Sequence, residues 1–320
     1  MSSPIQSTMP QGQDAQFNPT LRPWLRRVWQ DRSIILTGAQ QNGREEGSWL
    51  VYDRYNDPAE TAHTADFADF MRAMNTLWDD HDDVIESLTS QKRDIVPNTF
   101  YHFNCHNYDA LQHLSTKRIY ARTSGWQNSV QVARLVLAEM RATEGVQKFK
   151  IKGPGLSEDR CDSVVIWLTS ELAVLHLLMV LKRQPGLYSG SVPPGVKQVI
   201  AGLGWAEEPP ETGAGDQLTV LWNSRTHSYG SYLAGLIFFA LEQTSKTGIL
   251  DDQHGYREFL GRTLLYFGTA NVSPTDCHRL RRRNELEHMR AVTNHRLVMH
   301  SSIAGDLMTY DYFRNPTRLF

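Results

Sequence analysis

One block of the chain, residues 117–168, constrains the fold more than any other, because polar and apolar residues alternate within it. Three runs carry the pattern: Lys117–Arg122, Lys148–Lys152, and a third that opens with Arg160-Cys161-Asp162 and continues as the apolar Val164–Leu168. Successive side chains of a β-strand point to opposite faces, so alternation with a period of two is typical of strands. The block therefore predicts three strands of one sheet.

The same alternation gathers positive charge. Every second residue of the first two runs falls on one strand face, and if the strands are neighbours their faces form a strip of cations beside a phenol. Such a strip suits an anionic ligand, above all a phosphate, which guanidinium and ammonium groups bind strongly. The predicted strip contains Arg118, Tyr120, Arg122, Lys148, Lys150 and Lys152.

Helical periodicity surrounds this block. Residues 21–99 read as mainly helical, and a β-prone aromatic run, Thr99–Asn104, follows them. Further helices are predicted at Val130–Met140, capped by Asn128 or Ser129, and at Leu172–Leu181, capped by Thr169 or Ser170. Ser191–Pro210, rich in Gly and Pro, is predicted as a long ordered loop. A strand at Leu218–Trp222 and helices at Tyr232–Thr244, Tyr256–Phe267 and Glu285–His300 complete the pattern.

These elements predict an α+β fold with a central mixed, largely antiparallel sheet flanked by helices. We expect a disordered lead-in at residues 1–20, a mainly helical N-terminal region at 21–115, and an α+β domain with C-terminal helices at 116–320. With 320 residues, 40% of them hydrophobic, the chain can bury a full core.

Composition excludes several function classes. A net charge of -2 gives no global electrostatic basis for binding nucleic acid. Three scattered cysteines indicate a reducing compartment, and neither an apolar run of membrane-spanning length nor a Sec signal is visible. We therefore expect a cytoplasmic protein without membrane contact, although the polar start is also compatible with non-Sec secretion as an effector.

A metal centre is not expected. His102, Cys105 and His106 raise the possibility of zinc, but no second ligand pair at useful spacing follows them. No phosphate loop, dinucleotide fingerprint or kinase motif set is present either. The sequence predicts no cofactor.

Several motifs in order resemble the HopA-type effector family of plant-pathogenic bacteria and its relatives in peptide natural-product clusters. The resemblance spans about Lys117 to Leu241. Trp167 stands where the family usually has tyrosine. The motifs are Arg118-Ile119-Tyr120, Lys150-Ile151-Lys152-Gly153-Pro154, Arg160-Cys161-Asp162, Val192-Pro193-Pro194 through Glu207-Glu208-Pro209-Pro210, and Ser228-Tyr229-Gly230-Ser231.

The resemblance implies a lyase. Relatives in class V lanthipeptide and thioamitide pathways look like enzymes that β-eliminate phosphate from Ser or Thr of a precursor peptide, leaving dehydroalanine or dehydrobutyrine. A separate aminoglycoside-phosphotransferase-like kinase would phosphorylate the peptide and form a complex with the lyase. Related lyases use a strand Lys-x-His pair, which reads Arg118-Ile119-Tyr120 here, so the base must come from elsewhere.

Lys150 is the candidate base, since neighbouring cations would lower its pKa and free its amine. Tyr120 and His227 are the candidate acids. An exposed strand lysine, a half-buried tyrosine and an incidental loop histidine are the alternatives to these roles. Candidate phosphate or substrate ligands are Arg118, Arg122, Lys152, Arg160, Lys197, Arg225 and Tyr229, with Asp162 orienting a cation.

Two other functions stay open. The chain resembles effectors that act on host proteins, and it also fits a non-catalytic peptide-binding scaffold that activates a kinase. The run Arg279–Arg283 could dock an acidic leader peptide or the kinase, or be a solvated helix start.

Overall fold

The computed structural model divides the chain into two compact units, and each is described by itself. The helical unit comprises Met1–Asp57, Pro193–Gly195 and Pro209–Arg282, and the sheet unit comprises Pro58–Val192, Val196–Glu208 and Arg283–Phe320. The structure describes residues 14–55, 66–90, 95–105, 117–140, 145–156, 160–208, 229–248, 253–270 and 272–278.

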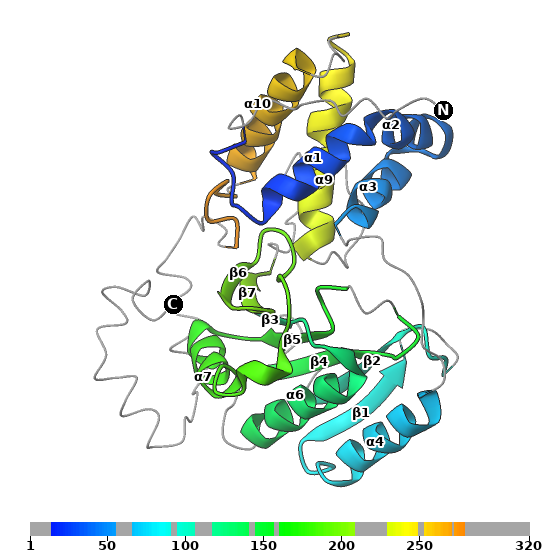
Figure 1. Cartoon of the computed structure of the whole chain (residues 1–320), viewed down its shortest axis with the longest axis vertical. Helices are drawn as coiled ribbons and strands as arrows, with labels where there is room; N and C mark the ends of the chain where they lie inside the picture. The colour runs from blue at the N-terminus through cyan, green and yellow to red at the C-terminus, as the bar shows by residue number, and fades with distance from the viewer. Residues whose placement is uncertain are drawn as a thin grey trace, which may run out of the picture. The chain divides into compact units, whose positions relative to one another are not determined.

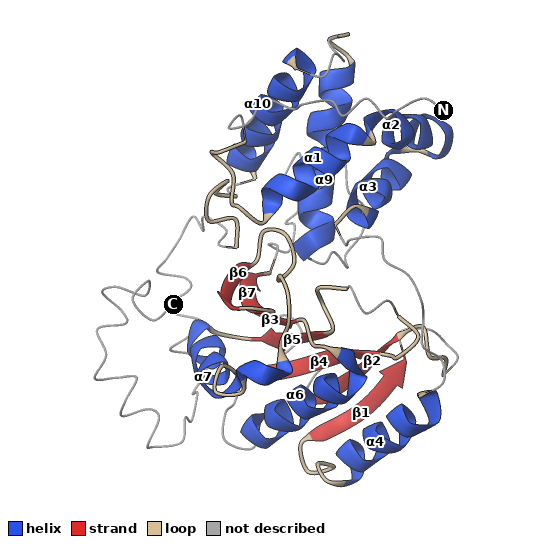
Figure 2. Cartoon of the chain, in the orientation of Figure 1, coloured by secondary structure: helices blue, strands red, loops and turns tan. Residues whose placement is uncertain are grey.

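The sheet unit is built on seven strands in the order β1-β2-β4-β5-β3-β7-β6, and every pairing among them is antiparallel (Figure 2). This confirms the predicted α+β class. The three strands predicted around the cationic strip are present, with β5 lying between the other two. The strands are β1 (Ile85–Ser90), β2 (Phe100–Cys105), β3 (Lys117–Ala121), β4 (Val146–Lys152), β5 (Val164–Leu168), β6 (Lys197–Ile200) and β7 (Leu203–Glu207).

One face of the sheet carries the core. Three helices, α4 (Phe67–Asp79), α6 (Gly125–Met140) and α7 (Glu171–Leu181), pack their apolar residues against it, as Figure 1 shows. Phe149 on β4 and Ile166 on β5 pair in the ladder and are both fully buried in this layer. Continuous burial of such apolar side chains is the main stabilising term of a domain this size.

The other face carries most of the polar residues of β2, β3 and β4. The register aligns His102, Lys150, Val165 and Tyr120 in one row across β2, β4, β5 and β3. The next row holds Asn104, Lys148, Trp167 and Arg118. Directly opposed residues share a face, so the two predicted sets of cations lie on one surface, which we call the cationic face.

The prediction of a loop over Ser191–Pro210 is wrong, because β6 and β7 form a hairpin within it. Gly202 makes the turn with φ of +70°, and a Cβ there would lie 2.7 Å from the Arg122 carbonyl oxygen. Pro and Gly on either side resemble loop signals, yet the intervening five residues of β7 are all buried against β3.

The helical unit contains α1 (Leu21–Gln30), α2 (Arg32–Asn42), α3 (Arg44–Asp53), α9 (Tyr229–Ser245) and α10 (His254–Thr269). Trp24 and Trp29 of α1 are fully buried in it. The helices predicted at Tyr232–Thr244 and Tyr256–Phe267 are thus confirmed. Among the helices that the structure describes, none is long and apolar enough to cross a membrane.

Helix starts were predicted with mixed success. Ser170 caps α7 as expected, its hydroxyl accepting a hydrogen bond of 3.1 Å from the Ala173 amide. The predicted cap of α6 at Asn128 or Ser129 is wrong, because that helix begins at Gly125. A side-chain oxygen in the first turn resembles a cap in sequence, and only the backbone path distinguishes the two.

Two predicted segments have different boundaries in the structure. Part of the lead-in, residues 14–20, is ordered, since Phe17 is buried and the Asp14 carboxylate binds Arg26 at 2.7 Å. The expected helical region at 21–115 includes β1 and β2, which belong to the sheet unit. The elements predicted at Leu218–Trp222 and Glu285–His300 lie outside the described residues.

Candidate functional site

Lys150 lies near the middle of the cationic face. Its Nζ atom is 3.7 Å from Asp162 Oδ2 and 3.6 Å from the centroid of the Phe100 ring. Burial lowers the pKa of Lys150 to about 8, the nearby Asp162 carboxylate opposes the shift, and Arg160 and Arg118 add to it. The lowered pKa that the sequence predicted is therefore present, although burial contributes more than the neighbouring cations.

Asp162, two residues before the start of β5, connects two cations. Its two carboxylate oxygens accept hydrogen bonds of 3.0 and 3.2 Å from Arg160 Nε and Nη2, which is a bidentate pair. Burial opposes the charged form, but Arg160 and Lys150 outweigh it and lower the pKa of Asp162. This geometry fits the predicted orienting role, because the carboxylate holds both Arg160 and Lys150.

Arg118 forms the second cation centre of the face. Its guanidinium lies 4.6 Å from the Trp167 ring centroid, and its Nε atom donates to the Glu208 carboxylate. Lys148 lies over the same indole at 4.9 Å. Burial lowers the pKa of Arg118, but Glu208 and Tyr120 more than compensate and raise it, so the guanidinium is charged. Trp167 thus fixes two cations by its π-face.

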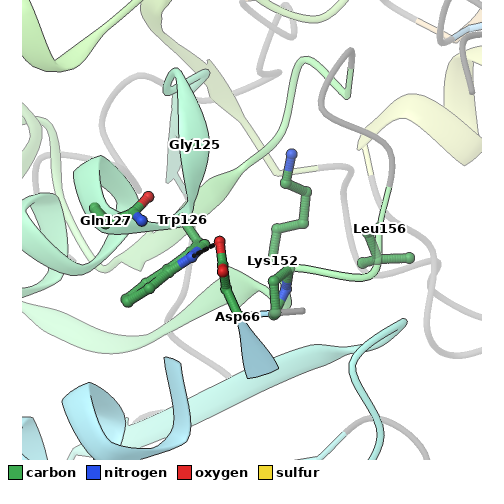
Figure 3. A pocket seen from close by; sticks show the side chains of 7 residues that line it. Asp66, Gly125, Trp126, Gln127, Lys152 and Leu156 are labelled. Carbon is green, nitrogen blue, oxygen red and sulfur yellow. Dashed lines mark hydrogen bonds between the residues drawn. The ribbon is translucent and has the colours of Figure 1, made fainter. Parts of the chain in front are cut away.

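Lys152 ends β4 beside a small cavity of about 70 Å³. Trp126 Nε1 donates to the Asp66 carboxylate at 3.2 Å in the wall of this cavity. Figure 3 shows the Lys152 ammonium pointing away from Asp66 and Trp126. A space of this volume is far smaller than typical ligand pockets. The cavity is lined by Asp66, Gly125, Trp126, Gln127, Lys152, Pro154 and Leu156.

Two predicted ligands, Lys197 and Arg122, lie away from the Lys150 centre of the face, and a third, Tyr229, belongs to the other unit. Lys197 pairs with Trp205, so it belongs to the opposite, helix-covered face. Tyr229 lies in the helical unit, where the carbonyl oxygens of Gly195, at 3.2 Å, and Cys277 are both placed to accept the single proton of its buried hydroxyl. This is a structural arrangement. Arg122 follows β3 and packs its guanidinium against Gly190. His227 and Arg225 lie outside the described residues.

His102 is a candidate that sequence reasoning missed. It was weighed only as a zinc ligand, yet the ladder places it directly opposite Lys150. Burial, with smaller effects from Lys150 and Lys148, lowers the pKa of His102 to about 4, so the imidazole is neutral near pH 7. The signal available in sequence was its place on the predicted strand Thr99–Asn104, where it shares one face with Phe100 and Asn104. Within the described ranges no three His, Cys, Asp or Glu side chains gather as metal ligands would.

The cationic face combines the parts that elimination of a phosphate requires. A partly neutral amine can accept a proton, and guanidinium groups can bind phosphate oxygens. Lys150 is 17% exposed and Arg118 is 11% exposed in their side chains, so both groups retain a path to solvent. Residues whose pKa values are shifted strongly and that lie together are typical of functional sites.

Comparison with known proteins agrees with this fold. Residues 91–220 match the model of the HopA1 effector protein family. The predicted resemblance to HopA-type effectors is therefore confirmed, and the match includes β2 to β7 and all of the cationic face. No curated protein matches the chain.

Two solved structures share the fold of most of the chain. The effector protein from Pseudomonas syringae pv. syringae strain 61 has a TM-score of 0.52 and 14% identity, covering 82% of this chain and 96% of its own. The effector protein from Pseudomonas syringae pv. tomato strain DC3000 has a TM-score of 0.51 and 17% identity, covering 81% of this chain and 98% of its own. At sequence identities this low, the similarity to these two effectors is a similarity of fold alone.

Proposed function

We propose that this HopA1-like chain is a lyase that β-eliminates phosphate from phosphoserine or phosphothreonine of a precursor peptide, in complex with the kinase that phosphorylates it. The observation that carries the proposal is the amine of Lys150, whose pKa is lowered to about 8, on a sheet face that also carries Arg118 and Tyr120. Arg160, from the segment before β5, lies over the Phe100 ring beside Lys150. A base and cations on one surface are what the reaction needs.

The step balances without an external reagent. The Lys150 amine takes the Cα proton of the phosphorylated residue, and the released electron pair forms the Cα–Cβ double bond. The Cβ–O bond breaks, and the oxygen leaves with its electron pair as phosphate. Tyr120 donates a proton to the leaving group. The ammonium of Lys150 then releases its proton to water and the Tyr120 phenolate takes one back from water, so both groups return to their starting states.

The cations divide the remaining work. Arg118 and Arg160 bind the phosphate oxygens and stabilise the charge that develops as the Cβ–O bond breaks. Asp162 keeps Arg160 and Lys150 in place. His102, neutral near pH 7, lies opposite Lys150 and can accept a hydrogen bond from its ammonium once the proton has been taken.

The test is direct. The purified chain is incubated with a synthetic phosphoserine or phosphothreonine peptide, with and without any kinase encoded beside its gene, and products are followed by mass spectrometry. Loss of phosphoric acid that needs Lys150 supports the proposal, with Lys150→Ala as the inactive control. Persistence of the phosphate under all of these conditions contradicts it.

A second function is favoured by the fold comparison: a secreted effector that acts on host proteins, because both structural neighbours are effectors. The same face would then receive a phosphorylated host protein. The two are separated by substrate, since a host-directed effector acts on or binds host proteins and leaves a precursor peptide unchanged.

A further inference from the structure

The contact between Arg118 and Glu208 has no part in the elimination chemistry. Arg118 Nε donates to the Glu208 carboxylate, and each side chain is only 11% exposed. The guanidinium also lies over Trp167. A planar cation that is held by an aromatic ring and bound to a carboxylate is a formed anion site with an anion of the protein already in it.

We propose that Glu208 is an internal competitor for the phosphate site: its carboxylate occupies Arg118 in the free protein and leaves when a phosphate group binds. The identity of the ligand as a phosphate ester rests on the proposed function. The competition itself requires no reaction, because it concerns only which anion binds Arg118.

The position of Glu208 permits such an exchange. Ala206 on β7 pairs with Arg118, and Glu208, two residues further, falls on the same face. The strand ends at Glu207, which pairs with Lys117, so Glu208 lies just beyond the hydrogen-bonded ladder. Its side chain can therefore leave Arg118 without breaking a strand pairing.

The competition sets a threshold for binding. A carboxylate carries one negative charge, whereas a phosphate monoester carries nearly two and offers three acceptor oxygens. A phosphate group can displace Glu208 with a net gain in binding free energy. An Asp or Glu side chain of a peptide gains nothing, because it exchanges one carboxylate for another. Glu208 would thus exclude unphosphorylated acidic segments from Arg118 and make the face selective for the phosphorylated peptide.

The experiment measures anion affinity rather than turnover. Isothermal titration of inorganic phosphate and of a synthetic phosphoserine peptide is performed on the full chain and on the variants Glu208→Gln, Arg118→Gln and the double variant. If Glu208 occupies the site for about nine tenths of the time, Glu208→Gln binds both probes about tenfold more tightly. In the Arg118→Gln background the same substitution changes the affinity by less than about twofold, since the competed group is absent.

Controls separate competition from general charge and from folding. Glu86→Gln removes a carboxylate from an exposed position of β1 and is expected to leave both affinities unchanged. Glu208→Asp keeps the charge on a shorter side chain and is expected to give a smaller gain, and thermal unfolding confirms that each variant is folded. An unchanged or weaker affinity of Glu208→Gln, or a gain that persists without Arg118, overturns the proposal.

The outcome is independent of the lyase assay. If Glu208→Gln binds the probes more tightly but no elimination is observed, the proposal that Glu208 competes for Arg118 stands and the proposed lyase function is rejected. Elimination by the wild type with no gain in the Glu208→Gln titration would do the reverse.

Discussion

Lys150 Nζ lies 3.7 Å from Asp162 Oδ2 while the same ammonium lies over the Phe100 ring. The carboxylate favours the charged amine and burial disfavours it, and the balance leaves the pKa at about 8 instead of 10.5. Asp162 also binds Arg160 in a bidentate pair, so its charge is shared. A lysine between these two influences is partly deprotonated near neutral pH, which a base requires.

Replacing Lys150 by Met should abolish elimination and stabilise the protein. A lysine with a lowered pKa in the folded state destabilises that state below its folded pKa, and the cost disappears as the pH rises towards the unfolded value. Lys150→Met should therefore raise the free energy of unfolding by about 1–3 kcal/mol at pH 7 and by much less near pH 10. Urea unfolding at the two pH values measures this.

The matched control for stability is Lys182→Met, because Lys182 is exposed at the end of α7. That variant should change the free energy of unfolding by less than about 0.5 kcal/mol at either pH. A destabilised Lys150→Met protein would show that Lys150 contributes to the fold, and retained turnover would show that it is not the base.

The rate of elimination should rise with pH along a limb whose apparent pKa is near 8, because the neutral amine is the reactive form of Lys150. Asp162→Asn should move this limb to lower pH. The carboxylate raises the pKa of Lys150, and its loss also leaves Arg160, which lowers that pKa, without its neutralising partner. Profiles of kcat/KM against pH for both proteins test the direction. A limb that stays in place or moves to higher pH would exclude Lys150 as the titrating base.

Trp167→Leu should weaken substrate binding more than it slows the chemical step. The indole orients Arg118 at 4.6 Å and Lys148 at 4.9 Å, and each cation–π contact contributes about 0.5–2 kcal/mol. We expect KM to rise by roughly fivefold or more with a smaller change in kcat, and Trp167→Phe to lie between wild type and Leu. Steady-state kinetics on a phosphopeptide separate the two constants, and equal KM values for all three proteins would contradict the assignment.

The cationic face was largely predictable from sequence, because strand alternation is a local property. Alternation alone placed Arg118 with Tyr120, and Lys148 with Lys150, on shared faces. It could not give the strand order, so the insertion of β5 and with it the position of Trp167 between the two sets came only from the structure.

The remaining errors depend on non-local pairing. Lys197 was predicted as a phosphate ligand, yet its pairing with Trp205 places it on the helix-covered face. A shift of one residue in the strand register would have placed it on the other face. His102 was missed because its partner, Lys150, is 48 residues away in the sequence, and only the β2–β4 ladder brings them together. Glu208 was noted only as part of a motif, because its contact with Arg118 is likewise non-local.

A second lysine of the sheet provides the structural contrast to Lys150. Lys117 is fully buried on β3, and its Nζ atom lies 2.8 Å from Glu207 Oε1. Removal of one member of a buried ion pair leaves the other charge without compensation and typically costs about 3–5 kcal/mol, whereas replacing both members by apolar groups costs far less. Glu207→Gln should therefore lower the free energy of unfolding by about 3 kcal/mol, and the double variant Glu207→Leu with Lys117→Met should recover much of that loss. Urea unfolding followed by circular dichroism measures both.

Because this pair lies on the face opposite Lys150, the folded fraction of each variant should bind a phosphopeptide like the wild type. A cost of the single substitution below about 1 kcal/mol would show that the pair is dispensable for the fold.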